Sequence, residues 1–263
     1  MEKISIIKIG GSIIDNEANL ASFLSAYAAI EGKKILIHGG GKLATKMAAD
    51  LNIPQQMVAG RRITDAATLK IVTMVYAGYI NKNIVAALQS KKINALGICG
   101  ADANIIKAHK RIHATTDYGF VGDIDAVDAE KIVQLLNAGL SLVVAPITHD
   151  GSGQLLNTNA DTMAQAIATA ISSVYEVSLV YSFEKKGVLS DINNNESVIS
   201  VIHPENYSAL KASGQVNEGM IPKLDNAFEA LEKGVTRVII GDALYIDHLI
   251  AGKAGTTIQK NNN

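Results

Sequence analysis

The chain has 263 residues, of which 48 % are hydrophobic, enough for one large domain or two modest ones with a substantial core. Its net charge of -1 argues against a strongly basic nucleic-acid-binding surface, and its single cysteine, Cys99, excludes an intramolecular disulfide. The sequence has neither an uninterrupted apolar run of membrane-spanning length nor a signal-peptide layout. We therefore expect a cytoplasmic protein with no nucleic-acid or membrane partner.

Short β-branched runs alternate along the chain with longer segments of helical periodicity. The predicted strands cover residues 3–9, 33–38, 92–98, 140–147, 175–183 and 237–242. The predicted helices cover residues 16–31, 42–51, 66–90, 128–138, 159–173 and 223–233. Strands that alternate with helices of this length predict an α/β fold, in which helices cover both faces of a mainly parallel sheet.

The chain is also predicted to divide into two lobes. Residues 1–170 would form an N-terminal lobe and residues 171–263 a C-terminal lobe, with the helix at 159–173 as the bridge. The polar stretch DINNNES at 191–197 is typical of a surface loop.

Two of the predicted strands end in glycine clusters: Gly10 and Gly11 after the first, and Gly39, Gly40 and Gly41 after the second. Glycine lets backbone N–H groups approach a ligand with no Cβ in the way. The carboxyl ends of parallel strands are also where open α/β sheets bind their ligands. We therefore predict two phosphate-binding loops, with two ordinary tight turns as the alternative.

Two common phosphate motifs fit the second cluster poorly. A Walker P-loop needs Ser or Thr after its lysine, and Leu43 stands there. The spacing from Gly39 to Ala44 matches a dinucleotide fingerprint, but no clean strand ending in an acidic residue follows before Asp65. A Rossmann-type oxidoreductase is thus an outside alternative.

Charged and amide side chains follow the predicted strand ends. Lys8 interrupts an apolar strand, and Lys223 stands at a helix start, where the dipole disfavours a cation unless an anion is bound. Asn157, Asn159 and Asp161 lie around the start of the helix at 159–173. An edge lysine and a helix cap are the ordinary interpretations, whereas a phosphoryl-transfer site would need such cations.

Arg62, in the stretch AGRRITD, is a forked donor suited to a carboxylate, with a plain surface arginine as the alternative. Asp15, shortly after the first glycine pair, is predicted to be a turn or helix-start residue.

Taken in order, these motifs resemble the amino acid kinase family, and within it the branch that phosphorylates N-acylated glutamate in arginine biosynthesis. The matching stretches are KIGGS (8–12), HGGGK (38–42), GRRITD (60–65), GFVGDI (119–124), GQLLNTNAD (153–161), GMIPKL (219–224) and AGTTI (254–258). The resemblance implies an open three-layer αβα sandwich around a mainly parallel sheet, as in carbamate kinase. It also implies a homodimer, for which the apolar helix at 66–90 is the candidate contact.

The implied reaction moves the γ-phosphoryl group of ATP, carried with Mg²⁺, onto the side-chain carboxylate of N-acetyl-L-glutamate. By resemblance, Lys8 and Lys223 flank the transferred group and Asp161 holds the two lysines in place. Magnesium would ride on the ATP oxygens, with few or no protein ligands. The N-terminal lobe would bind the acylglutamate, and the C-terminal lobe the adenine and ribose.

The resemblance also assigns the remaining site residues. Gly11 and Gly40 would offer backbone N–H groups to the phosphates, while Gly10, Gly39 and Gly41 shape the loops, with Gly40 and Gly41 also next to the substrate. Arg62 and Asn157 would bind the α-carboxylate and acylamide of the substrate, with Asn159 beside them.

Some features depart from the family pattern. The stretch SFEKKGVL at 182–189 places Glu184 nearest the usual aspartate, and GDALYIDH at 241–248 replaces a usual turn, so the nucleotide contacts there stay open. The acyl group, acetyl or succinyl, also stays open. A regulatory relative that binds nucleotide or amino acid without chemistry should lack one of Lys8, Asp161 and Lys223, and all are present. The first predicted strand begins near Lys3, with no preceding helix of the kind that builds arginine-inhibited hexamers, so we expect a dimer without arginine feedback.

Overall fold

A computed structural model describes residues 1–58, 61–191, 193–212 and 220–261. Gly60 and Gly219, which begin two of the family motifs, and Ile192, in the polar loop, lie outside the described residues.

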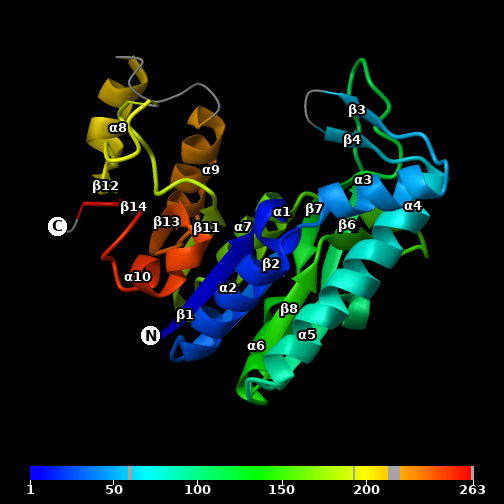
Figure 1. Ribbon diagram of the computed structural model, residues 1–263, viewed down its shortest axis with the longest axis horizontal. Helices are drawn as coiled ribbons and strands as arrows, with labels where there is room; N and C mark the ends of the chain where they lie inside the picture. The colour runs from blue at the N-terminus through cyan, green and yellow to red at the C-terminus, as the bar shows by residue number, and fades with distance from the viewer. Residues whose placement is uncertain (59–60, 192, 213–219, 262–263) are drawn as a thin grey trace.

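A central sheet, of eight strands within the described residues, runs through the molecule (Figure 1). The strands lie in the order β12 (Val201–Ile202), β14 (Thr256–Gln259), β13 (Arg237–Asp242), β11 (Tyr175–Phe183), β1 (Glu2–Ile9), β2 (Lys33–His38), β8 (Ser141–Ala145) and β5 (Ala95–Cys99). Neighbours from β13 to β5 pair in parallel, whereas β14 pairs antiparallel with β13 and parallel with β12. The prediction of a mainly parallel sheet is confirmed.

Helices cover both faces of this sheet. One face carries α6 (Ala129–Asn137), α7 (Ala160–Ile171), α8 (Pro204–Ala212) and α9 (Ile221–Glu232). The other carries α2 (Glu17–Ala29), α3 (Gly41–Asp50), α4 (Ala66–Thr73), η1 (Met74–Ile80), α5 (Asn81–Gln89) and α10 (Ile246–Ile250). In β1 the strand alternation sends Ile4 and Ile6 into the first core, and Ile7 and Ile9 into the second. The fold is therefore the predicted three-layer αβα sandwich.

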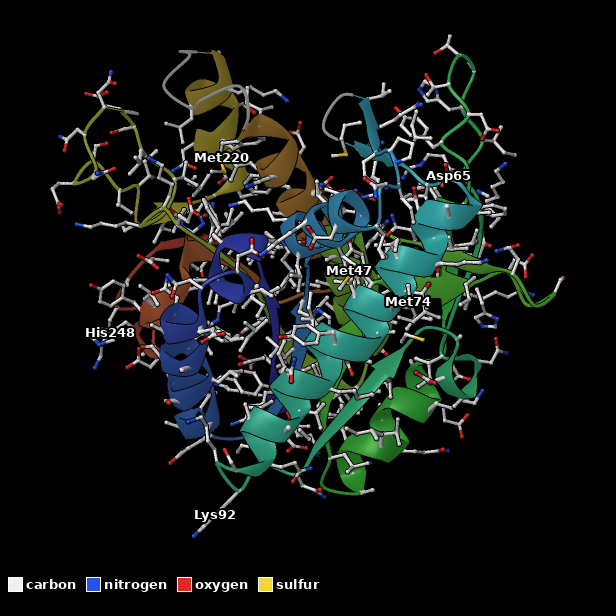
Figure 2. All side chains as sticks on the ribbon, turned by 45° about the vertical axis from the view of Figure 1, so that its right-hand side comes forward. Met47, Asp65, Met74, Lys92, Met220 and His248 are labelled. Carbon is white, nitrogen blue, oxygen red and sulfur yellow. The ribbon has the colours of Figure 1, made fainter. Side chains whose placement is uncertain are left out.

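The helix predicted over 66–90 is present, but its middle is a π-helix, so α4, η1 and α5 form one rod with an irregular centre. Figure 2 shows the rod running from Asp65, its N-cap, to the turn before Lys92. By length and mean hydropathy (1.3), Ala66–Gln89 could cross a membrane. Its residues Leu69, Val72 and Ile84 are buried against the sheet, as in the core helix of a globular protein.

Several elements escape the sequence prediction. A smaller sheet orders β10 (Leu155–Asn157), β9 (Ile147–His149), β6 (Ile106–Lys110) and β7 (Gly122–Val127), and β3 (Gln56–Val58) forms a hairpin with β4 (Arg61–Ile63). The short elements α1 (Gly11–Ile14), η2 (Asp102–Asn104) and η3 (Ala243–Tyr245) were not predicted either. The predicted strand 140–147 is wrong as a single strand, because Pro146 separates β8 from β9 and lacks the N–H that a sheet ladder needs.

The main sheet continues across the predicted lobe boundary. β11, the first strand of the predicted C-terminal lobe, pairs with every residue of β1 from Glu2 to Ile9. The two lobes thus share one sheet, and the division at residue 170 stays a prediction.

Candidate active site

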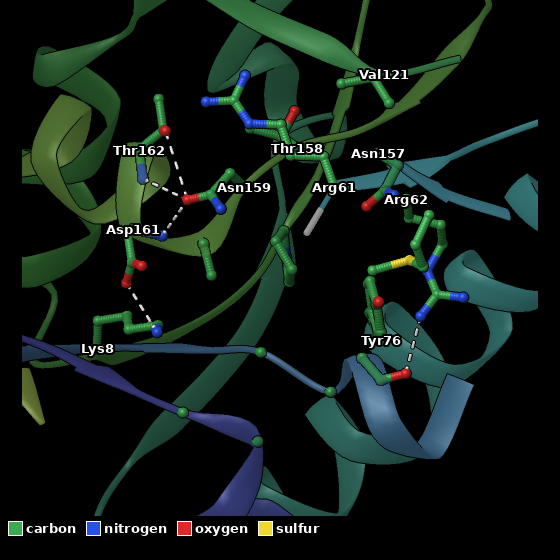
Figure 3. Close-up of a pocket in the computed structure, with 18 of the residues that line it drawn as sticks. Lys8, Arg61, Arg62, Tyr76, Val121, Asn157, Thr158, Asn159, Asp161 and Thr162 are labelled. Carbon is green, nitrogen blue, oxygen red and sulfur yellow. Dashed lines mark hydrogen bonds and ion pairs between the residues drawn. The ribbon is translucent and has the colours of Figure 1, made fainter. Parts of the chain in front are cut away.

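A cleft of about 420 Å³ opens at the carboxyl ends of β1 and β2 (Figure 3). It is lined by ten of the predicted site residues: Lys8, Gly10, Gly11, Gly39, Gly40, Gly41, Arg62, Asn157, Asn159 and Asp161. The eleventh, Lys223, instead lines a small adjoining hollow of about 50 Å³. Lys8, Asp161 and Asn226 border both spaces, so the cleft and the hollow meet at these side chains.

Lys8 owes its position to strand alternation. It follows Ile4 and Ile6 on the face of β1 that α7 covers, and β1 lies between β2 and β11 in the interior of the sheet. Its side chain is 17 % exposed, and its Nζ lies 2.7 Å from Oδ1 of Asp161. The alternative of an edge lysine is therefore wrong, because β1 is a central strand and the ammonium faces the cleft.

The start of α7 positions Asp161. Oδ1 of Asn159 accepts hydrogen bonds from the backbone N–H groups of Asp161 (2.8 Å) and Thr162 (3.0 Å), so Asn159 is the N-cap of this helix. The Asp161 carboxylate is free of capping and pairs with Lys8, as the dashed lines in Figure 3 show. The capping interpretation thus holds for Asn159 but does not account for Asp161.

Lys223 lies in the first turn of α9, and its Nζ is 4.3 Å from the centre of the Phe183 ring. Desolvation lowers the pKa of Lys223, the Lys8 cation lowers it further, and the Asp161 carboxylate raises it. The three charges therefore act on one another, although the close ion pair joins Asp161 to Lys8.

Gly40 is the glycine in these loops that tolerates no side chain. Its φ is +148°, and a Cβ there would lie 2.3 Å from Cδ1 of Ile80 and 3.1 Å from the Tyr76 ring. For Gly10, Gly11, Gly39 and Gly41 the nearest contact of such a Cβ is 3.4 Å or more, which is ordinary packing. Gly10 and Gly41 are also not simple turn residues, since Gly10 caps α1 and Gly41 begins α3.

The guanidinium of Arg62 is hydrogen-bonded at the start of α3 and is not free on the surface. Its Nη2 donates to the carbonyl of Gly41 (3.0 Å) and to Oγ1 of Thr45 (2.9 Å), and its Nη1 donates to Oε1 of Gln55. These neutral partners leave its charge uncompensated beside the cleft. The surface-arginine alternative is wrong.

Asn157, the last residue of β10, belongs to the smaller sheet and also lines the cleft. Its backbone N–H donates to the carbonyl of Phe120 (2.8 Å), and its Nδ2 donates to Oγ1 of Thr64 (3.0 Å). The side chain is half-buried and lines the cleft with its amide oriented.

Six other polar residues line the cleft: Thr158 and Thr162, which lie beside the predicted Asn157, Asn159 and Asp161, and four that the sequence analysis did not indicate, Arg61, Tyr76, Arg111 and Asn226. Two had a usable signal, since Arg61 precedes Arg62 and Asn226 lies one helical turn after Lys223. Tyr76 and Arg111 had none, because each reaches the cleft only through tertiary packing. Asp15, in contrast, ends α1 as predicted for a turn residue, and its N–H donates to the Gly11 carbonyl (2.8 Å).

The sequence model of the amino acid kinase family matches residues 3–242. The chain belongs to the amino acid kinase family. This membership removes the Rossmann-type oxidoreductase alternative and agrees with a cleft rich in cations and glycine.

Close relatives belong to one branch of this family. An acetylglutamate kinase of Cytophaga hutchinsonii is 55 % identical over 251 residues, which cover 95 % of each chain. An acetylglutamate kinase of Bacteroides fragilis is 52 % identical over 261 residues, 98 % of each chain.

Solved structures share the fold at lower identity. An N-acetylglutamate synthase from Neisseria gonorrhoeae, complexed with coenzyme A and N-acetyl-glutamate, has a TM-score of 0.82 at 20 % identity, over 99 % of this chain and 60 % of the synthase. Carbamate kinase from Giardia lamblia, bound to AMP-PNP, has a TM-score of 0.72 at 14 % identity over 99 % of each chain. The carbamate-kinase-like architecture is thus confirmed.

Proposed function

We propose that this kinase phosphorylates N-acetyl-L-glutamate to N-acetyl-L-glutamyl 5-phosphate, the second step of arginine biosynthesis. The relatives that are 52–55 % identical over almost the whole chain are named for this activity. The observation that carries the proposal in the structure is the Lys8–Asp161 pair at the meeting point of the cleft and the Lys223 hollow.

In this reaction a carboxylate oxygen of the substrate bonds to the γ-phosphorus of ATP, and the bond from that phosphorus to the β,γ-bridging oxygen breaks, releasing ADP. The acceptor is already an anion, so no general base is required, and catalysis consists of positioning and charge stabilisation. Lys8 and Lys223 would neutralise the transferred group from two sides. Asp161 would act as a positioning residue that holds the ammonium groups.

Different parts of the cleft would bind the phosphates, the acylglutamate and the nucleoside. The backbone N–H groups of Gly11 and Gly40 would contact phosphate oxygens. The guanidinium of Arg62 would bind the α-carboxylate of the acylglutamate, and the oriented amide of Asn157 its acylamide, with Asn159 alongside. The C-terminal segment from 171 would hold the adenine and ribose, where Glu184 and the 241–248 stretch leave the detailed contacts open.

The side chains of the site fit a magnesium ion carried by the nucleotide. Within the described part of the chain no group of three or more His, Cys, Asp and Glu side chains could hold a metal ion. Asp161, the acid that lines the cleft, is paired with Lys8. When bound, Mg²⁺ would supply further neutralisation of the phosphates, and the chain would contribute cations around them.

The test measures ADP release from MgATP with N-acetylglutamate, N-succinylglutamate, free glutamate and free aspartate as acceptors. The proposal expects release with an acylated glutamate and background rates with the free amino acids. Turnover confined to free glutamate or aspartate would reassign the branch, and ATP binding without turnover would favour a regulatory relative.

One observation favours N-succinyl-L-glutamate as a second candidate substrate, because its acyl group ends in a carboxylate. Arg61 lines the cleft (Figure 3), and no hydrogen bond or ion pair joins its guanidinium to another described residue, although its charge helps to lower the pKa of Asp123. Arg111, the next arginine of the cleft, is already bound to Asp123, with Nε–Oδ1 at 3.0 Å and Nη2–Oδ1 at 2.5 Å. With Arg62 assigned to the α-carboxylate, Arg61 is a second cleft cation without an ion-pair partner among the described residues, and it could meet the extra negative charge of a succinyl group.

This second candidate predicts that Arg61→Gln lowers kcat/KM for N-succinylglutamate about 10-fold or more, because a charge-assisted contact is lost. The value for N-acetylglutamate should change about 2-fold or less. Equal effects on both substrates would remove the candidate.

A cytoplasmic homodimer also belongs to the proposal. The rod and its neighbour α3 expose Met47, Met74 and Tyr79, with relative exposures of 39 %, 55 % and 64 %. Figure 2 shows Met47 and Met74 on the same side of the molecule. Such exposed apolar side chains support a contact through this surface, and light scattering gives the molecular mass that tests it.

A further inference from the structure

His38, the last residue of β2, has no part in the mechanism above, yet it is completely buried directly behind the second glycine loop. Its Nδ1 lies 2.9 Å from the carbonyl oxygen of Gly39. Its Nε2 lies 3.2 Å from Nδ2 of Asn81, the first residue of α5, which is itself 1 % exposed. Both ring nitrogens are therefore engaged.

The partners of His38 determine its tautomer. A carbonyl oxygen only accepts, so Nδ1 carries the proton that bonds Gly39. The Asn81 amide is oriented by its neighbours, because its Nδ2 also donates to the carbonyl of Val143 (2.9 Å) and its Oδ1 accepts from Nζ of Lys82 (3.1 Å). Asn81 thus presents N–H to Nε2, which must be the bare acceptor. Burial, reinforced by the Lys82 cation, lowers the pKa of His38 to about 4 and keeps this ring neutral.

The hydrogen bond from His38 to the Gly39 carbonyl fixes the orientation of the next backbone N–H, that of Gly40. The peptide between Gly39 and Gly40 is planar and trans, so its C=O and N–H point in opposite directions. With the Gly39 carbonyl turned toward the buried imidazole, the N–H of Gly40 points away from it, to the side where Gly39, Gly40 and Gly41 line the cleft. The N–H of Gly39 is held too, by the carbonyl of Ile9 (3.3 Å).

The π-helical segment supports the same loop from a second direction. Tyr76 and Ile80 of η1 close over Gly40, and Asn81, the next residue, bonds His38. This part of the rod therefore supplies three contacts that support the loop, from Tyr76, Ile80 and Asn81. Irregular turns of this kind occur often at functional sites.

We propose that His38 is a positioning residue for phosphoryl transfer: its Nδ1–H holds the Gly39 carbonyl and so directs the Gly40 N–H at the transferred phosphoryl group, while Asn81 sets the tautomer that makes this possible. The inference rests on the proposed function, because it assumes that the phosphoryl group passes this loop. It gives a reason for a fully buried histidine that touches no ligand.

Three substitutions at His38 separate positioning from packing. His38→Leu removes both polar contacts. His38→Asn places an amide nitrogen near the position of Nδ1, within reach of Gly39, whereas the longer His38→Gln places it near Nε2, within reach of Asn81. Removal of one preorganised backbone donor costs about 100-fold in kcat, so we expect a loss of that order for Leu and Gln and recovery to within about 5-fold of wild type for Asn.

Melting temperatures of all three variants provide the structural readout. If His38 only packs the core, kcat follows the melting temperature and the Asn and Gln variants lose activity alike; that outcome, or wild-type kcat in His38→Leu, overturns the inference. Calorimetric binding of AMP-PNP keeps the test independent of the substrate, because wild-type protein that binds AMP-PNP but turns over no acceptor refutes the proposed function alone. In that case, weaker AMP-PNP binding in the Leu and Gln variants, restored in the Asn variant, would still support the positioning role, and equal AMP-PNP binding in all forms would contradict it.

Discussion

The ammonium of Lys8 and the carboxylate of Asp161 lie 2.7 Å apart, although the residues come from a central strand and from the start of a helix on one face of the sheet. The pair is not sealed in the core, since the two side chains are 17 % and 39 % exposed at the cleft. A pair that faces solvent contributes little to stability. Its position therefore matters more for the charge it presents to a ligand than for folding.

Replacing Lys8 with methionine should lower kcat by about 100-fold or more, because one preorganised cation at the transferred phosphoryl group is lost. Lys3→Met is the matched control, since this lysine lies on the same strand but is 82 % exposed and 3.8 Å from Glu176. Steady-state kinetics on both variants make the comparison. Equal kcat values in the two would remove Lys8 from the reaction.

Asp161→Asn should change the pH profile of the enzyme as well as its rate. The Asp161 carboxylate raises the pKa of Lys223 against desolvation, so its neutralisation lets Lys223 lose its proton at lower pH. If protonated Lys223 stabilises the phosphoryl group as proposed, the alkaline fall in kcat should begin at lower pH in the variant. Parallel profiles for variant and wild type would contradict the coupling.

Arg62→Lys should raise the KM for the acylglutamate by about 10-fold to 100-fold, because one ammonium cannot replace a forked donor at a carboxylate. The KM for ATP should stay nearly unchanged. Thr45→Val is the control, since it removes one partner of the Arg62 guanidinium and leaves the charge in place. If both KM values rise together in Arg62→Lys, the residue does not act on the acylglutamate alone.

Stability should fall on acidification in a way that depends on His38. The pKa of this buried imidazole is about 4 in the folded protein, against an ordinary 6.5 in the unfolded chain. Between these values the unfolded state binds the extra proton, so the free energy of unfolding decreases as pH falls from 6.5 to 4, by up to about 3 kcal/mol. Urea titrations across this range should show a shallower decrease for His38→Asn, and identical slopes would refute the assignment of a neutral histidine.

Much of the site could be predicted from the sequence, because the patterns that indicate it lie in short stretches of consecutive residues. A lysine inside the apolar run of β1, and glycines where β1 and β2 end, mark a ligand-binding edge from a few consecutive residues. The capping pattern around Asn159 likewise identified the helix that holds Asp161. These residues meet in space because parallel strands end at one edge of the sheet.

Other parts depend on tertiary contacts that no local pattern reveals. The π-helical turn in the rod is irregular where Tyr76 and Ile80 pack on Gly40, and its apolar sequence reads as a plain helix. The reversal of β14 beside β13, and the smaller sheet built from β6 and β7, follow from pairings distant in the sequence. Arg111 reaches the cleft through that smaller sheet, which explains why sequence periodicity missed it.

Hydroxylamine trapping tests whether this cleft transfers a phosphoryl group from ATP to a carboxylate. Hydroxylamine converts an acyl phosphate into a stable hydroxamate, which distinguishes a carboxylate acceptor from ATP hydrolysis. With MgATP and N-acetylglutamate, we expect wild-type protein to form hydroxamate in step with ADP, and Lys8→Met to form about 100-fold less. ADP release without hydroxamate, from either acylated glutamate, would contradict this transfer.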